Sequence, residues 1–227
     1  MPWPWEDLSL VDRFWLLTAR VHPITRPTPS VRFGMAMAAI RTIERAGEIR
    51  WVGRDEHARL LAIADCRCPQ PLRGWHDALQ ADQPRDLDGV AARFALDPLL
   101  RTPWFDEAEH LVGLGLVTVE RSRFGPLGRN SYTLADVPEL RRRRRDLIEL
   151  ILPRDGSVHD LPADVLDLLV VARAADALPD LLRSPGLYPR PRLADAIDVV
   201  TESSRDRLRL EAAAAYRNAV FPGGGPG

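Results

Sequence analysis

Apolar residues recur at the spacing of an α-helix along most of this chain, and this periodicity constrains the fold more than any other feature. The strongest stretches predict helices over 6–20, from Ser30 as N-cap to Gly47, and over 99–114, 137–152 and 161–177. Shorter helices are expected over 72–79, 87–94, 180–187, 193–201 and 205–220. The stretch 48–52 alternates like a strand, and 59–65 fits either a strand or a short helix. The pattern predicts a mainly α protein.

A β-hairpin interrupts the helices in the second half of the chain. Its predicted strands are 116–120 and 131–134, and the glycine- and proline-containing stretch 124–130 is its turn. The preceding helix, Gly115 and the hairpin together have the outline of a winged helix. The chain has 227 residues and no obvious linker, which favours a single compact domain.

This domain is expected to cover 6–221 and to be helical, with a projecting β-hairpin and one or two other short strands. A flexible Gly/Pro tail is expected over 222–227.

Positive charge is concentrated in one segment. The whole chain has a formal net charge of −1, whereas residues 121–145 contain eight arginines and two acidic residues, a local charge of +6. Four of these arginines define a basic helix surface: Arg141, Arg142, Arg144 and Arg145. Such a cluster is typical of a surface that binds phosphate groups on lipid or nucleic acid, and equally of a solvated helix face.

The hairpin turn combines apolar and cationic side chains. Phe124 and Leu127 lie between Arg121, Arg123 and Arg129. An apolar tip flanked by cations suits a membrane interface or a protein partner, while its glycine and proline residues are also those of an ordinary turn.

The helix before the hairpin disfavours nucleic acid as a partner. In DNA-binding winged helices this element enters the major groove. Here its exposed side is expected to present Asp106, Glu107, Glu109 and His110, whose carboxylates would repel phosphate. A winged-helix DNA-binding regulator is therefore retained only as an alternative.

The sequence contains no recognisable catalytic or metal site. It has no dinucleotide or phosphate-loop glycine motif and no nucleophile elbow, and its five histidines are scattered. Its two cysteines, Cys66 and Cys68, are expected to be reduced thiols. The first residues do not resemble a signal peptide, and no apolar run is long enough for a transmembrane helix. We expect a non-enzymatic protein without cofactors, cytoplasmic or peripheral on the cytoplasmic face of a membrane.

Four stretches resemble the Golgi phosphoprotein 3 family, which is defined by the GPP34 domain, and especially its short actinobacterial members. They are the leucine-rich start 8–17, the helix-to-strand turn 43–51, the helix-to-hairpin segment 110–120 with the basic helix 141–152, and the helix 164–178. These stretches follow the family's order over nearly the whole chain.

The resemblance implies a peripheral membrane protein that binds phosphatidylinositol 4-phosphate through a basic pocket. It also implies that the hairpin promotes membrane contact or self-association into a homo-oligomer. One pocket arginine of the family aligns with Arg101, and Arg32 lies one turn from the position of another. Both are therefore implied as ligands of the lipid head group.

The leading hypothesis is a protein that binds anionic phospholipid at a membrane surface. Arg101 and Arg32 would hold the head group, and Phe124 and Leu127 would enter the interface. A scaffold that binds an acidic protein partner through the same arginines is the remaining alternative, because both functions need the same basic surface.

Overall fold

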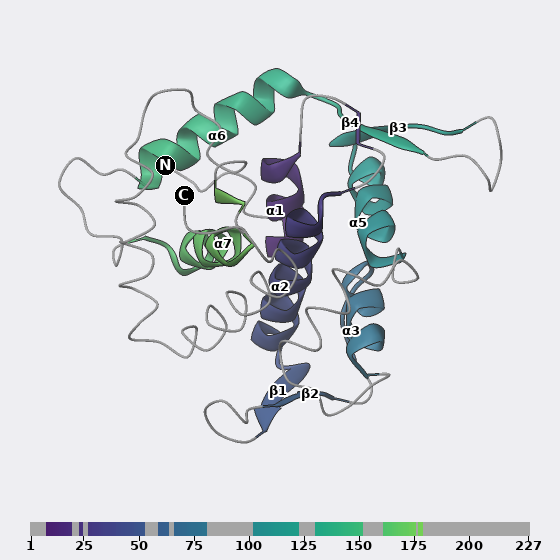
Figure 1. Cartoon of the computed structure of the whole chain (residues 1–227), viewed down its shortest axis with the longest axis vertical. Helices are drawn as coiled ribbons and strands as arrows, with labels where there is room; N and C mark the ends of the chain where they lie inside the picture. The colour runs from purple at the N-terminus through teal and green to yellow at the C-terminus, as the bar shows by residue number, and fades with distance from the viewer. Residues whose placement is uncertain are drawn as a thin grey trace, which may run out of the picture.

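A computed structural model of the chain describes residues 8–19, 23–24, 27–52, 59–63, 66–80, 102–122, 130–151, 161–175 and 177–178. The helices in these ranges are α1 (Leu10–Thr18), α2 (Pro29–Arg45), α3 (Leu72–Gln80), α5 (Thr102–Gly113), α6 (Val137–Ile151) and α7 (Ala163–Ala174) (Figure 1). The strands form two antiparallel pairs, β1 (Ile49–Val52) with β2 (Arg59–Ala62) and β3 (Val117–Glu120) with β4 (Ser131–Leu134). The prediction of a mainly α protein with a β-hairpin and one or two other short strands is confirmed, and the other strands are two, β1 and β2, within the described ranges.

Some predicted elements lie outside the described residues. These are the helices over 87–94, 180–187, 193–201 and 205–220, the tip of the hairpin, and the tail. The predicted domain limits, 6 and 221, are also outside them.

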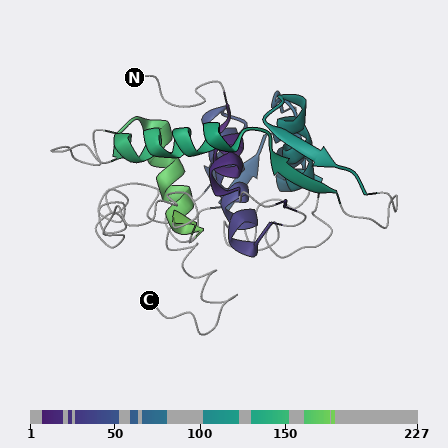
Figure 2. The ribbon, with the colours of Figure 1, turned by 90° about the horizontal axis from the view of Figure 1, so that it is seen from above.

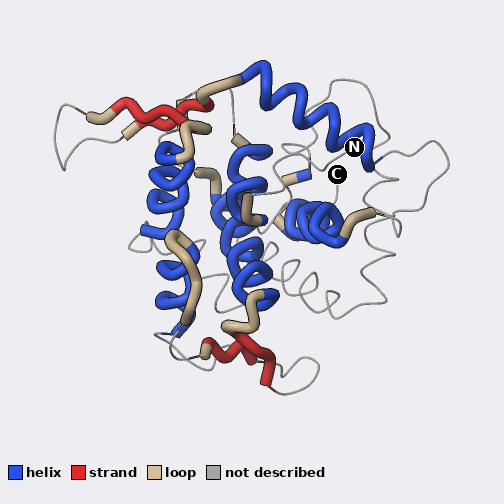
Figure 3. The backbone as a smooth tube through the Cα atoms, turned by 180° about the vertical axis from the view of Figure 1, so that it is seen from behind, coloured by secondary structure: helices blue, strands red, loops and turns tan. Residues whose placement is uncertain are grey.

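Helices α1, α2 and α7 pack together beside α5 and α3 (Figures 1 and 3). Every residue of α1 from Val11 to Thr18 is buried, so this helix is enclosed on all sides. Helix α7 contributes the buried residues Val165, Leu168, Leu169, Val171 and Ala172. Helix α7 is therefore a core helix.

Ion pairs tie α7 to its neighbours at the edge of this core. Arg13 of α1 contacts Asp164 of α7. From α2, Nε of Arg41 and Nη2 of Arg45 lie 3.1 Å and 2.6 Å from Oδ2 of Asp167. These contacts join α7 to α1 and α2, two helices that lie near the start of the chain.

Helices α1 and α2 approach closely at Gly34. A Cβ atom placed on Gly34 would lie 2.1 Å from Cζ of Phe14 and 3.0 Å from Cβ of Ala175. Phe14 and Ala175 are both buried, so neither side chain has free space to move away. Only glycine fits this position without a rearrangement of the core.

The start of α2 differs from the prediction. Thr28, not Ser30, is the N-cap, and its hydroxyl accepts a hydrogen bond from the backbone N–H of Val31 at 3.2 Å. The helix begins earlier because Pro29 follows Thr28, and proline suits the first helical position, where its missing N–H costs nothing. Helix α1 is shorter than expected and begins at Leu10, after a capping box formed by Ser9 and Asp12.

Two hairpins follow glycines with positive φ at the ends of helices. Gly47 (φ 77°) separates α2 from β1, and Gly115 (φ 73°) separates α5 from β3. Residues 59–65, for which the sequence fitted either a strand or a short helix, contain strand β2, and Ala62 lies opposite Ile49. In the second hairpin Val117 pairs with Leu134.

The segment before α2 also pairs with the second hairpin. The backbones of Ile24 and Tyr132 exchange two hydrogen bonds, of 2.8 Å and 3.0 Å. The ring of Tyr132 packs edge-on against Trp104, with 5.6 Å between centroids, and Trp104 lies 6.0 Å from Trp15. These contacts bury Tyr132 and fix the base of the hairpin against α5 and α1.

Helix α6 follows directly after β4 and extends away from the hairpin, so the two point to opposite sides of the molecule (Figures 1 and 2). The β1–β2 pair lies at the end of the molecule opposite α6 (Figure 3). Within the described ranges, no helix is both long enough and apolar enough to cross a membrane.

Candidate anion-binding surface

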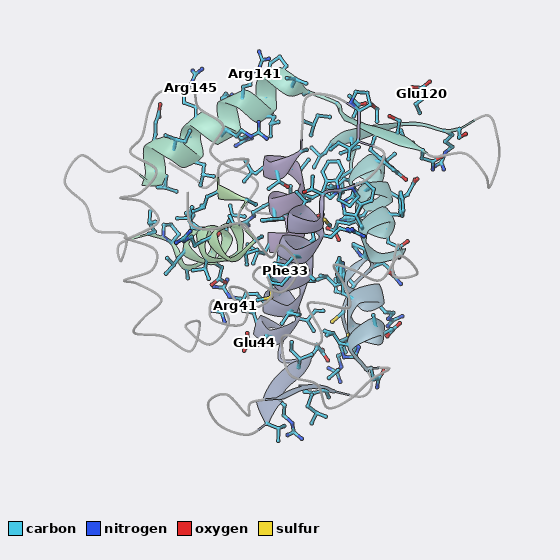
Figure 4. All side chains as sticks on the ribbon, in the orientation of Figure 1. Phe33, Arg41, Glu44, Glu120, Arg141 and Arg145 are labelled. Atoms are coloured by element: carbon cyan, nitrogen blue, oxygen red, sulfur yellow. The ribbon has the colours of Figure 1, made fainter. Side chains whose placement is uncertain are left out.

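The outer face of α6 presents two arginines that have no charged partner in the part of the chain that the structure describes. Arg141 and Arg145 are exposed, stand one helical turn apart, and point away from the helical core (Figure 4). Neither has an ion-pair or hydrogen-bond partner among the described residues. Each guanidinium is therefore free to bind an anion.

The other surface arginines of α6 share one carboxylate. Glu139 lies 2.7 Å from Nη2 of Arg142 and 2.5 Å from Nε of Arg143. The hydrogen bond from Arg142, followed by the one from Arg143, lowers the pKa of Glu139. Part of the positive charge of the basic helix is thus neutralised within the helix itself.

Arg144 differs from the prediction that it belongs to the exposed basic surface. It is buried, with 7% of its surface exposed. Its Nε and Nη2 donate to the carbonyl oxygen of Leu17 at 3.1 Å and 2.5 Å, and Nη2 also donates to that of Ala19 at 2.9 Å. The last carbonyls of a helix lack partners within the helix, so Arg144 caps the carboxyl end of α1. Its role in the structure is to join α6 to α1.

The base of the hairpin is electrically balanced. Nη2 of Arg121 lies 3.0 Å from Oε2 of Glu109, and the hydroxyl of Tyr132 donates to Oε1 of the same carboxylate at 2.9 Å. Glu120, at the end of β3, is exposed and points outward (Figure 4). The described part of the hairpin therefore adds no net positive charge to the surface.

The predicted head-group site falls largely outside the part of the chain that the structure describes. Arg101 lies outside the described residues, as do Arg123, Phe124, Leu127 and Arg129 of the hairpin tip. Arg32 lies on α2, and its buried Nε has no hydrogen-bond partner in the described ranges. No interaction within those ranges links Arg32 to α6 or to the hairpin.

The acidic face expected on α5 is smaller than predicted. Glu107 is fully buried rather than exposed. Burial raises the pKa of Glu107 well above its ordinary value of 4.5, and the nearby carboxyl groups of Asp12 and Asp106 raise it further. Nε2 of His110 lies 3.8 Å from Oδ1 of Asp12. Glu107 therefore belongs to a buried acid pair with Asp12, and the fold favours its neutral form.

This acid pair predicts that the stability of the protein depends on pH. Between its ordinary pKa and its raised pKa, Glu107 binds a proton in the folded state but not in the unfolded state. The free energy of unfolding should therefore fall as the pH rises above about 4.5, until the raised pKa is passed. Glu107→Gln, which keeps a neutral polar group, should flatten this slope in urea unfolding measured from about pH 5 to about pH 9.

Glu149→Gln removes an exposed carboxylate of α6 and serves as the control, with the wild-type slope expected. An unchanged slope in Glu107→Gln would contradict this prediction.

Both unexpected residues follow the apolar periodicity of their helices. In α6, Arg144 continues the buried stripe of Leu140, Leu147 and Ile148. In α5, Glu107 continues the stripe of Trp104, Ala108 and Leu111. Their phase in the helix was therefore the sequence signal that could have identified them as buried. Their charge alone predicted the opposite, that both side chains lie on the surface.

Among the described residues, no group of three or more histidine, cysteine, aspartate or glutamate side chains could hold a metal ion. Comparison of the chain with protein-family models and with curated proteins found no match.

Proposed function

We propose that this protein is a non-catalytic, peripheral membrane protein that binds anionic phospholipid through the outer face of α6. The observation that carries the proposal is the pair Arg141 and Arg145, exposed one turn apart and without a carboxylate partner in the described ranges. Guanidinium groups form paired hydrogen bonds to phosphate oxygens, and each arginine near an anionic membrane contributes about 1 kcal/mol of attraction.

The packing of α6 supports a surface that is ready to bind. Arg144 fixes the helix to α1, and Glu139 orients Arg142 and Arg143 beside the two free arginines. The helix that carries the arginines is thus fixed to the rest of the protein, so binding does not need to order its backbone. Free thiols at Cys66 and Cys68 are consistent with the cytoplasmic face of the membrane as the place of binding.

We also infer that the chain is related to the Golgi phosphoprotein 3 family. The order of elements supports this relation: α1, then α2 leading through Gly47 to β1, then α5 leading through Gly115 to the hairpin and α6, and finally α7. Under this inference, phosphatidylinositol 4-phosphate is the first lipid to test, and self-association would involve the hairpin.

Liposome co-sedimentation tests the proposal. Vesicles of phosphatidylcholine alone are compared with vesicles that also contain phosphatidylglycerol or phosphatidylinositol 4-phosphate. The wild-type protein should bind only the anionic vesicles, and less at high salt. Arg141→Ala/Arg145→Ala should weaken this binding by roughly thirtyfold, since two arginines contribute about 2 kcal/mol.

A second double variant controls for net charge. Arg50→Ala/Arg67→Ala removes two exposed arginines, one in β1 and one between β2 and α3, remote from α6. It should bind like the wild type. Equal loss in both double variants would mean that net charge alone drives binding. Unchanged binding by the α6 variant would contradict the proposed surface.

A further inference from the structure

The two cysteines of the chain form one contact pair. Cys66 and Cys68 are the only cysteines and lie between β2 and α3. The backbone N–H of Cys68 donates to Sγ of Cys66 at 3.0 Å, which brings the two residues into direct contact. Both are free thiols. The side chain of Cys66 therefore folds forward along the chain, toward its partner.

The two sulfurs differ in access to solvent. Cys68 is buried, with 6% of its surface exposed, whereas Cys66 is partly exposed. Burial, followed by the contact with Cys66, raises the pKa of the Cys68 thiol to about 12. An external reagent therefore reaches Cys66 first, whereas the thiol of Cys68 is shielded from solvent and less reactive.

Arg73 and Glu48 complete the surroundings of the pair. Nη2 of Arg73 donates to the carbonyl oxygen of Cys66 at 3.4 Å, which places a cation beside the segment. Glu48 disfavours a negative charge on Cys68, and Arg73 favours one. The pair therefore lies in a mixed electrostatic environment and not in a purely apolar one.

We propose that Cys66 and Cys68 form a reversible dithiol–disulfide site whose oxidant is a low-molecular-weight disulfide. The thiolate of Cys66 attacks one sulfur of that disulfide, forms a mixed disulfide and releases one thiolate. The sulfur of Cys68 then loses its proton and attacks Sγ of Cys66, which closes the Cys66–Cys68 bond and releases the second thiol. The protein loses two electrons and two protons, and the oxidant is reduced to two thiols.

The short sequence separation favours reversibility over a structural role. A bond between residues one apart closes a very small loop, so it constrains the unfolded chain little. Strained or exposed disulfides have more oxidising potentials and are reduced readily by cellular thiols, and Cys66 is the partly exposed end of this bond. The site therefore fits a protein kept in a reducing compartment, where oxidation is transient.

Thiol trapping tests this proposal on the full chain. The reduced protein is incubated with glutathione disulfide. The cysteine thiols that remain on the protein are then alkylated, and the intact mass is measured. Wild type should lose both alkylation sites together, without a retained glutathione adduct. Cys68→Ala should instead accumulate one glutathione on Cys66. Cys66→Ser should react at least about tenfold more slowly, because its remaining thiol is buried and weakly acidic.

Circular dichroism establishes that each variant is folded before it is oxidised, and the denatured wild type shows that both thiols are alkylated when exposed. A glutathione adduct retained on wild-type Cys66 while Cys68 remains alkylatable would overturn the proposal. So would two fully alkylatable cysteines after exposure to the oxidant. Addition of reduced glutathione should restore both alkylation sites, and failure to do so would overturn the claim of reversibility.

Discussion

Gly34→Ala is expected to lower the free energy of unfolding by about 3 kcal/mol, even though alanine is the better helix former. Within an unconstrained helix this substitution would stabilise by about 1 kcal/mol. Here the added Cβ would lie 2.1 Å from Cζ and 2.6 Å from Cε1 of Phe14. The ring is fully buried, so α1 and α2 must separate or the core must repack. Thermal unfolding should show a Tm lower by roughly 10 °C.

Two variants test the cause of this destabilisation. A Cβ on Gly113, in the last turn of α5, meets no atom within 4 Å, so Gly113→Ala should be neutral or slightly stabilising. Phe14→Leu removes the ring atoms that clash, so in the Gly34→Ala background it should cost much less than in the wild type. Additive effects of Gly34→Ala and Phe14→Leu would exclude this steric explanation.

Arg144→Ala is expected to destabilise the protein by about 3 kcal/mol. The substitution removes the hydrogen bonds to Leu17 and Ala19 and leaves their carbonyl groups without the donor that caps α1. Helix α1 has no basic residue of its own in its last turn, so nothing on that helix replaces the lost cation. Urea unfolding should give a lower midpoint with a similar slope.

The neighbouring arginine provides the control. Arg145→Ala removes an exposed guanidinium from the same helix and should change stability by no more than about 0.5 kcal/mol. Arg144→Lys keeps the charge but not the planar fork, and should recover only part of the loss. If Arg144→Ala and Arg145→Ala were equally mild, the capping role of Arg144 would be refuted.

Local features of the sequence predicted most of the described helices, strand β1 and the β3–β4 hairpin, and left β2 open between strand and helix. Apolar spacing identified α1, α2, α5, α6 and α7, and the glycines at 47 and 115 identified the turns that follow α2 and α5. The start of α2 was missed because the preference of Pro29 for the first helical turn outweighed Ser30 as a cap. Such local preferences act within a few residues, so the sequence shows them directly.

The arrangement of the candidate site depended on contacts that no local pattern contains. Arg144 and Leu17 are 127 residues apart, and Arg13 and Asp164 are 151 residues apart. Arg144 was predicted to share a basic surface with Arg141, Arg142 and Arg145, but it is buried and only the other three are exposed. Glu107 was likewise predicted to be exposed. Its burial beside Asp12 arises only when α1 packs against α5, and no local pattern contains that contact.

The inward stripe of α6 also limits how this helix could meet a bilayer. Its apolar residues Leu140 and Leu147, with the stem of Arg144, already fill the protein interior. Because the apolar face of α6 is already buried in the protein, this helix cannot insert that face among the acyl chains, as an isolated amphipathic helix does. Contact through Arg141 and Arg145 would therefore be a shallow adsorption at the plane of the lipid phosphates, which competing ions reverse readily.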